Sequence, residues 1–222
     1  MVSKLEYSTS VEDYLKVIHE LSRASGEAVS AEVAARLKIA RASVSTMVRR
    51  LAKRGLIVHA RNRRLRLTQK GRAAALRLVR RHRVLEAYLV AALGYTWDRV
   101  HKEAEHLEHS ASDELIDRMA TLIGDPTVDP HGAPIPTAGG KVAESATRAL
   151  NDLTVGEKAR IARVEDEDAE FLRYLTSLHL LPGTTVRLVG REPFGGSLQV
   201  RVASRTRRVG PSAAARVFVT SR

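Results

Sequence analysis

Histidine and carboxylate side chains recur at helical spacing in the middle of the chain. The set, in chain order, is His82, Glu86, His101, Glu105, Glu108 and His109. Because helical residues three or four positions apart lie on one face, this spacing brings several carboxylates and imidazoles within reach of one another. Such a face is electrostatically costly by itself, and a divalent cation would relieve the repulsion. The spacing therefore predicts a metal site.

The types of side chain restrict the metal. The chain contains no cysteine, which excludes disulfides, zinc thiolate sites and thiol catalysis. If the first predicted helix packs nearby, Asp13, which lies off its apolar stripe, could add an oxygen ligand. Oxygen and imidazole ligands suit Mn(II) or Fe(II), although Zn(II), Co(II) and Ni(II) also occupy such sites. The ordinary alternative is that a His and Glu pair at this spacing is exposed and binds nothing.

Charge is distributed unevenly along a chain whose formal net charge is +12. Residues 41–83 contain fifteen Lys or Arg and no acid, whereas residues 84–131 contain ten acids and three bases. The basic stretch favours a polyanionic partner, either nucleic acid or an acidic membrane surface. The acidic stretch suits cations, so the two functions are expected in neighbouring sections.

Apolar periodicity predicts the elements that position these residues. Helices are expected over about 11–25, 31–37, 42–54, 72–93, 97–109 and 112–123. Short strands at 56–60 and 65–68 flank the basic loop Arg61 to Arg64 and form a wing. The N-terminal part is thus a winged helix-turn-helix.

The C-terminal part has a different pattern. Breaker residues fill 124–140, and β-type runs follow at 159–164, 185–189, 198–202 and 216–219, with one helix at 169–178. The expected fold is mainly α, with a small C-terminal β-barrel. The expected domains are 1–71 (winged helix-turn-helix), 72–140 (helical), 141–152 (linker) and 153–222 (barrel).

The predicted helix at 42–54 has the composition of a DNA recognition helix. Small or hydrogen-bonding side chains at its start suit base edges, and the surrounding arginines suit phosphates. The alternative is a solvated basic helical hairpin. The candidate DNA contacts are Arg41, Ala42, Ser43, Ser45, Thr46, Arg49, Arg50, Arg61, Arg63 and Arg64.

Several motifs together resemble the diphtheria toxin repressor family of metal-dependent regulators, particularly its manganese-responsive branch. The resemblance covers essentially the whole chain, and residues from 153 onward resemble the family's FeoA-type, Src-homology-3-like barrel. The motifs are Val11-Glu12-Asp13-Tyr14-Leu15, Ala42-Ser43-Val44-Ser45, Leu67-Thr68-Gln69-Lys70-Gly71, Arg81-His82-Arg83-Val84-Leu85-Glu86, residues 101–109 and Asp129-Pro130-His131-Gly132-Ala133-Pro134-Ile135-Pro136.

The resemblance implies a homodimer with two metal positions per subunit. Metal binding would order the N-terminal helix and set the distance between the two DNA-binding domains to the spacing of a palindromic operator. One position would use His82, Glu86 and His101 with a barrel residue. The barrel candidates are Glu167 and Glu170, with Asp168 as a substitute. The other, activating position would use Asp13, Glu105, Glu108 and His109.

Two departures from the family bear on the metal. Iron-responsive members carry methionine and cysteine where this chain has Asp13 and Glu105, so the resemblance favours manganese. Short manganese regulators carry glutamate where this chain has Lys16 and lack the barrel. This difference argues against a closely bridged two-metal cluster of their kind.

We therefore expect a cytoplasmic, Mn(II)-activated repressor of metal-transport genes, with Fe(II) as the alternative metal and no reaction catalysed. The N-terminus lacks an apolar signal core, and no apolar run approaches the roughly 20 residues that cross a bilayer. A metal-dependent hydrolase is one alternative, but the sequence has no His-Glu-x-x-His motif or phosphate-binding glycine loop. A winged-helix regulator that senses an organic ligand, or nothing, is another.

Overall fold

The computed structural model describes residues 7–59, 64–143, 146–165 and 168–221. The chain divides into two compact units. The first contains residues up to His82 together with 107–117 and 136–141, and the second contains 83–106, 118–135 and 142 onward. Helix α4 (Gln69–Leu93) contributes to both units.

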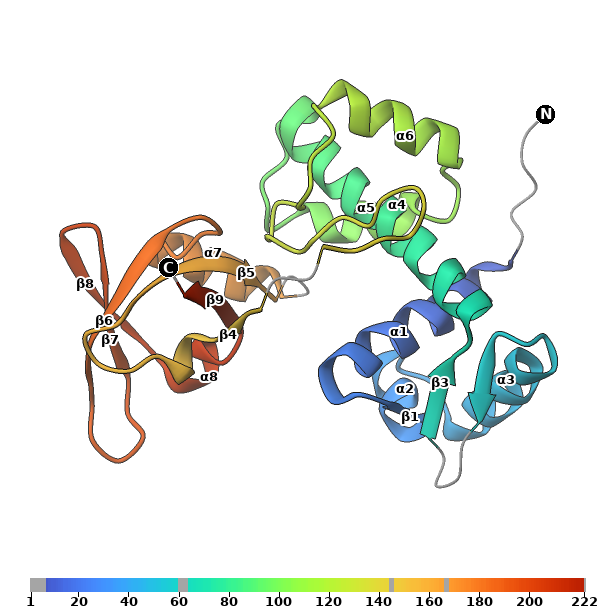
Figure 1. Ribbon diagram of the computed structural model, residues 1–222, viewed down its shortest axis with the longest axis horizontal. Helices are drawn as coiled ribbons and strands as arrows, with labels where there is room; N and C mark the ends of the chain where they lie inside the picture. The colour runs from blue at the N-terminus through green and yellow to red at the C-terminus, as the bar shows by residue number, and fades with distance from the viewer. Residues whose placement is uncertain (1–6, 60–63, 144–145, 166–167, 222) are drawn as a thin grey trace. The chain divides into compact units, whose positions relative to one another are not determined.

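The first unit contains the predicted winged helix-turn-helix (Figure 1). The apolar periodicity of its helices follows from the core that they share, which includes Leu15, Ile18, Val44, Leu51 and Leu65. The wing strands pair antiparallel in a three-stranded sheet of order β1-β3-β2. The elements are α1 (Thr9–Ser25), β1 (Ala28–Val29), α2 (Ser30–Arg36), α3 (Arg41–Lys53), β2 (Ile57–His59) and β3 (Arg64–Leu67).

A close backbone contact joins the wing to the start of α4. A β-carbon on Gly71 would lie 1.9 Å from the carbonyl oxygen of Leu56, which only glycine avoids. The same carbonyl accepts the backbone N–H of Thr68 at 3.0 Å. Helix α4, which carries His82 and Glu86, therefore begins in direct contact with the wing.

Helices α5 (Val100–Leu107) and α6 (Asp113–Leu122) are shorter than predicted. The prediction that the helix begins at Trp97 is wrong because Trp97 packs against the barrel core and donates its indole N–H to Thr176 Oγ1 at 2.9 Å. The prediction that it reaches His109 is also wrong, because Ser110 N closes a turn onto the carbonyl of Leu107 at 3.0 Å. Glu108 and His109 thus lie in a turn.

The barrel is a six-stranded antiparallel sheet of order β4-β9-β5-β6-β7-β8, wrapped around an apolar core (Figure 1). The fold-class prediction is confirmed. The elements are β4 (Arg148–Ala149), η2 (Leu150–Asp152), β5 (Lys158–Val164), α7 (Ala169–Leu178), β6 (Thr185–Arg191), β7 (Leu198–Val202), β8 (Arg205–Val209), α8 (Pro211–Ala214) and β9 (Val217–Ser221).

Strand β8 was not predicted from the sequence. It is an edge strand whose side chains from Arg205 to Arg208 are polar, and only Val209 is buried. Without alternating apolar residues, nothing local marks it as a strand. Across the described ranges of the chain, no helix is both long and apolar enough to span a membrane.

Candidate metal centre and nucleic-acid interface

Asp13, Glu108 and His109 form one group of potential metal ligands in the first unit. Each offers an atom within 4.8 Å of the others. His109 Nε2 lies 2.9 Å from Asp13 Oδ1 and 3.6 Å from Glu108 Oε1. Helix α1 supplies Asp13, and the turn after α5 supplies the other two. Two carboxylates and one imidazole are donors that Mn(II) and Fe(II) accept.

Glu12, the neighbour of Asp13, orients the imidazole of this group. Its Oε2 lies 2.7 Å from His109 Nδ1, and its other oxygen lies 3.6 Å from Arg81 Nη1. A neutral His109 that donates Nδ1–H to Glu12 directs the lone pair of Nε2 toward Asp13 and Glu108. This arrangement of an imidazole between a metal position and a carboxylate is common in metalloproteins. Glu12 was not predicted as part of the site.

The carboxylates raise the pKa of His109 from its ordinary value of 6.5 to about 9. The main causes are the hydrogen bonds with Asp13 and Glu12, which outweigh the opposite effect of burial. Without a metal, His109 is therefore an imidazolium at neutral pH and donates from both nitrogens. A metal ion that binds Nε2 has to displace a proton.

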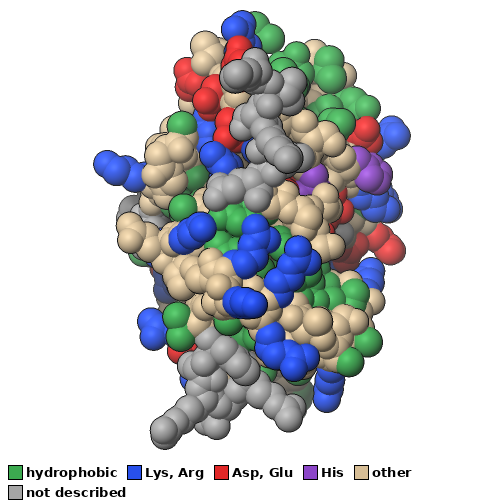
Figure 2. Space-filling model, turned by 90° about the vertical axis from the view of Figure 1, so that its right-hand side faces the viewer, with side chains coloured by type: hydrophobic (Ala, Val, Ile, Leu, Met, Phe, Trp, Pro, Cys, Tyr) green, Lys and Arg blue, Asp and Glu red, His purple; other side chains and the backbone are tan. Residues whose placement is uncertain are grey.

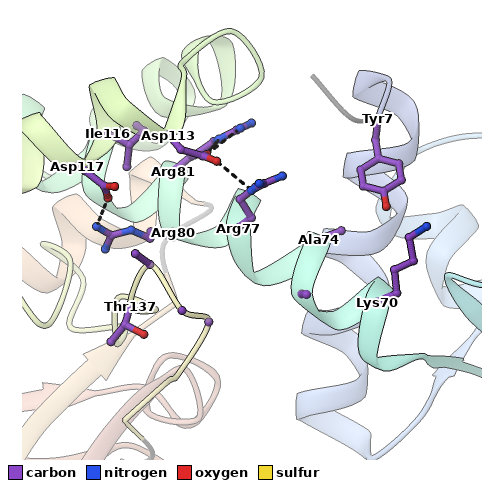
Figure 3. A pocket seen from close by; sticks show the side chains of 14 residues that line it. Tyr7, Lys70, Ala74, Arg77, Arg80, Arg81, Asp113, Ile116, Asp117 and Thr137 are labelled. Carbon is purple, nitrogen blue, oxygen red and sulfur yellow. Dashed lines mark hydrogen bonds and ion pairs between the residues drawn. The ribbon is translucent and has the colours of Figure 1, made fainter. Parts of the chain in front are cut away.

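A cavity of about 480 Å³ lies between α4, α6 and residues 137–140, and Arg81 is one of the residues that line it. Figure 3 shows Arg77, Arg80 and Arg81 extending from α4 toward Asp113 and Asp117 of α6. Arg77 and Arg81 each lie within 3.0 Å of Asp113, and Arg80 lies 2.6 Å from Asp117. The ion pair with Asp113 holds Arg81 in place, and Arg81 in turn contacts Glu12.

A second group of potential ligands, Glu86, Asp129 and His131, is buried in the second unit. His131 Nε2 lies 2.7 Å from the carbonyl oxygen of Trp97. Because a carbonyl only accepts, Nε2 carries the proton, and a neutral imidazole keeps its lone pair on Nδ1. That atom lies 3.6 Å from Glu86 Oε2. Glu86 Oε1 also lies 3.2 Å from His101 Nδ1.

The loop that carries Asp129 and His131 is hydrogen-bonded to strand β5. Asp129 Oδ1 accepts the backbone N–H groups of His131 and Ala133 at 2.8 and 2.9 Å. The carbonyl of His131 accepts Val164 N at 3.0 Å. This loop belongs to the motif of residues 129–136, but its side chains were not predicted as ligands, because they lie in a breaker-rich stretch without periodicity. The available sequence signal was a carboxylate and an imidazole, Asp129 and His131, on either side of Pro130.

The other predicted metal ligands lie as follows. His82 is one helical turn before Glu86 on α4, belongs to the first unit, and places Nδ1 2.5 Å from Glu108 Oε2. Glu105 is exposed, and its Oε1 lies 3.6 Å from His101 Nε2. It does not belong to the Asp13 group of the described residues.

Two of the three barrel candidates, Asp168 and Glu170, lie at the start of α7. Glu170 is exposed in the first turn of α7. Asp168 caps that helix by accepting the backbone N–H groups of Glu170 and Phe171, and its other oxygen lies 3.2 Å from Arg216. Within the described ranges, neither Asp168 nor Glu170 belongs to a ligand group. Glu167 lies outside the described residues.

The predicted recognition helix α3 turns its polar side outward. Val44, Val48 and Leu51 are buried. The exposed candidates are Arg41, Ala42, Ser43, Ser45, Thr46, Arg49 and Arg50. Figure 2 shows a face of the molecule on which Lys and Arg side chains gather at the centre and acids lie mainly at the margins. Such a face attracts a polyanion.

The wing is only partly described. Arg64 is 58% exposed and lies 2.7 Å from Glu27, so one of its possible phosphate-binding nitrogens already has a partner. Arg61 and Arg63 lie outside the described residues.

Three family descriptions match successive parts of the chain. "Iron dependent repressor, N-terminal DNA binding domain" matches residues 6–65. "Iron dependent repressor, metal binding and dimerisation domain" matches residues 68–137, and "FeoA domain" matches residues 148–221.

Individual relatives agree with these matches. The chain is 32% identical over 194 residues to the diphtheria toxin repressor of Corynebacterium glutamicum, covering 82% of this chain and 85% of that protein. It is 39% identical over 127 residues to the iron-dependent repressor IdeR of Mycobacterium leprae, and this match covers 57% of the chain and only 55% of that relative's length. A solved "Manganese-dependent transcriptional repressor complex with manganese" has 39% identity and a TM-score of 0.89, covering 95% of this chain and 99% of that one.

The chain therefore belongs to the diphtheria toxin repressor family of metal-dependent, DNA-binding transcriptional repressors. The resemblance predicted from the sequence motifs is confirmed.

Proposed function

We propose that this chain is a Mn(II)-activated homodimeric repressor that binds a palindromic operator and controls metal-transport genes, with Fe(II) as the alternative activating metal. The observation that carries the proposal is the group of Asp13, Glu108 and His109, whose ligand atoms lie within 4.8 Å of one another. Its donors are oxygen and nitrogen only, which favours harder ions. Bound there, the metal would supply positive charge that joins α1 to the turn after α5.

A second metal position would lie around Glu86. His101 contacts this carboxylate directly, and Asp129 and His131 share its buried surroundings. His82 precedes Glu86 by one helical turn, in agreement with the ligand set that the family resemblance implies. The proximity of Asp129 and His131 to Glu86 supports them as donors at this position. They would take the place of the barrel residue that the family resemblance implies.

The DNA contacts would come from α3 and the wing, and the dimer from the helical region. α3 presents seven exposed candidate residues and is free of acids. The match to a dimerisation domain supports the homodimer. Leu107 and Leu115, which are 41% and 44% exposed, are candidate contacts with a second copy.

An operator-binding titration against Mn(II), Fe(II), Zn(II) and no metal tests the proposal. We expect a metal-induced gain in operator affinity that Mn(II) produces most effectively. Operator binding that is equal with and without a chelator would instead support a winged-helix regulator that is not controlled by metal.

A further inference from the structure

A lysine ammonium contacts one member of the first ligand group, the carboxylate of Glu108. Lys16 Nζ is 3.0 Å from both carboxylate oxygens of Glu108 and 3.2 Å from His82 Nδ1. The side chains of Lys16 and Glu108 are only 13% and 2% exposed. Lys16 follows Asp13 by three residues on α1, so the same helix supplies both a candidate ligand and this cation.

Glu108 has its charge neutralised by these neighbours. Burial by itself raises the pKa of Glu108, but the hydrogen bond with His82 and the charge of Lys16 outweigh burial, so its pKa lies below the ordinary value. Both oxygens of the carboxylate face the ammonium at hydrogen-bonding distance. The metal-free arrangement is therefore stable without a divalent ion, unlike a group of unpaired carboxylates.

A divalent ion at Asp13, Glu108 and His109 would meet this lysine. Because the ammonium is within hydrogen-bonding distance of both oxygens of Glu108, the ion has to compete with it for this carboxylate. If the ammonium remained in place beside the ion, two positive charges would lie a few ångströms apart in a poorly solvated place, where their repulsion is strong.

We propose that Lys16 is an internal competitor of the metal ion, which lowers the affinity of the site and so sets the metal concentration at which the protein responds. The inference rests on the metal site of the proposed function. It predicts that removing the charge of Lys16 strengthens metal binding, although it weakens the metal-free fold. If Lys16 had only a structural role, removing its charge would instead weaken metal binding.

The test is calorimetry of Mn(II) binding to the full chain without DNA. Lys16→Met keeps a long unbranched side chain but removes the charge, and we expect it to bind Mn(II) about tenfold more tightly than wild type or better. Its melting temperature without metal should fall, while the gain in melting temperature on adding Mn(II) should grow. Lys16→Gln, which can still donate a hydrogen bond to Glu108, is the second neutral variant if Lys16→Met does not fold without metal.

Two controls separate the effect of this charge from that of net charge. Lys16→Arg retains the cation and should bind Mn(II) no more tightly than wild type. Lys158→Met removes one charge from an exposed position of β5 and should leave Mn(II) affinity unchanged. If wild type binds Mn(II) but folded Lys16→Met and Lys16→Gln bind it no more tightly, the inference is wrong and the metal site stands. If wild type does not bind Mn(II), both the inference and the proposed function fail.

Discussion

At the scale of single residues, His109 is where a proton and a metal ion compete. Its two nitrogens face Glu12 and Asp13 at 2.7 and 2.9 Å. In the metal-free protein, the imidazolium of His109 donates one hydrogen bond to each of these carboxylates. In the metal-bound protein one nitrogen has to give up its proton, so pH and metal concentration act on the same atom.

The metal-free protein should consequently lose stability as pH rises. The folded pKa of His109, about 9, lies above its ordinary value of 6.5. Stabilisation from the protonated imidazole is fully present below the lower value and is lost as pH rises through the upper one. Urea unfolding with a chelator at several pH values between these limits should show a falling free energy of unfolding.

His109→Gln is the control for this titration, because it should remove most of the fall. Glu12→Gln removes one of the two carboxylates and should move the fall to lower pH. If His109→Gln and wild type have the same pH dependence of unfolding, His109 is not the group responsible.

At the scale of elements, the loop of residues 129–133 places two candidate ligands only because it packs on β5. A β-carbon on Gly132 would lie 2.0 Å from the carbonyl oxygen of Ala162, and its φ of +85° also disfavours other residues. Gly132→Ala should therefore destabilise the protein and weaken the second metal position, while binding at Asp13, Glu108 and His109 persists. Thermal unfolding and the number of Mn(II) ions bound per chain measure the two effects.

Gly195→Ala is the matched control for the loop. Gly195 also has a positive φ, +75°, but no atom lies within 4 Å of an added β-carbon. It should show only the modest cost of the backbone conformation and an unchanged metal stoichiometry. Equal losses in the two variants would mean that the contact with β5 is unimportant.

Helix α3 leads to a prediction about salt. Phosphate contacts release counterions, so replacing exposed Arg49 and Arg50 with alanine should weaken binding to all DNA and reduce the salt slope by about one unit per lost contact. The preference for operator over random DNA should change much less. DNA-binding isotherms at several salt concentrations provide the measurement.

Arg205→Ala with Arg208→Ala removes the same charge from exposed positions of β8 and serves as the comparison for α3. A salt slope that stays at the wild-type value in the Arg49 and Arg50 double variant would show that α3 does not contact phosphates.

At the scale of the whole molecule, metal and operator would bind one shared conformation. Each must then raise the other's affinity by the same factor, typically about 5–150-fold for a coupling of about 1–3 kcal/mol. Calorimetry of Mn(II) binding with and without operator, beside operator binding with and without Mn(II), should give equal factors. Glu108→Gln should remove this gain while circular dichroism shows an intact helical fold.

Glu114→Gln, an equal change of charge at an exposed position on α6, should keep the coupling. Mn(II) affinity that is the same with and without operator would contradict the repressor mechanism, even if both ligands bind.

The sequence by itself predicted what depends on local pattern. Apolar periodicity predicted the helices from α1 to α4, because each buries one face in a core. The spacing of His82 and Glu86 placed them on one helix face, and the acid-free stretch of residues 41–83 predicted the basic α3. These features need only the geometry of a single element.

Only the tertiary structure decided which distant side chains meet. Glu12 reaches His109 across 97 positions, and Lys16 reaches Glu108 across 92. Asp129 and His131 meet Glu86 because their loop is fastened to β5, whereas Glu105 is exposed near His101. No periodicity encodes such contacts, because they arise from packing between elements that are far apart in the chain. The sequence thus determined the kinds of ligand available, and packing determined how they are grouped and which cation contacts Glu108.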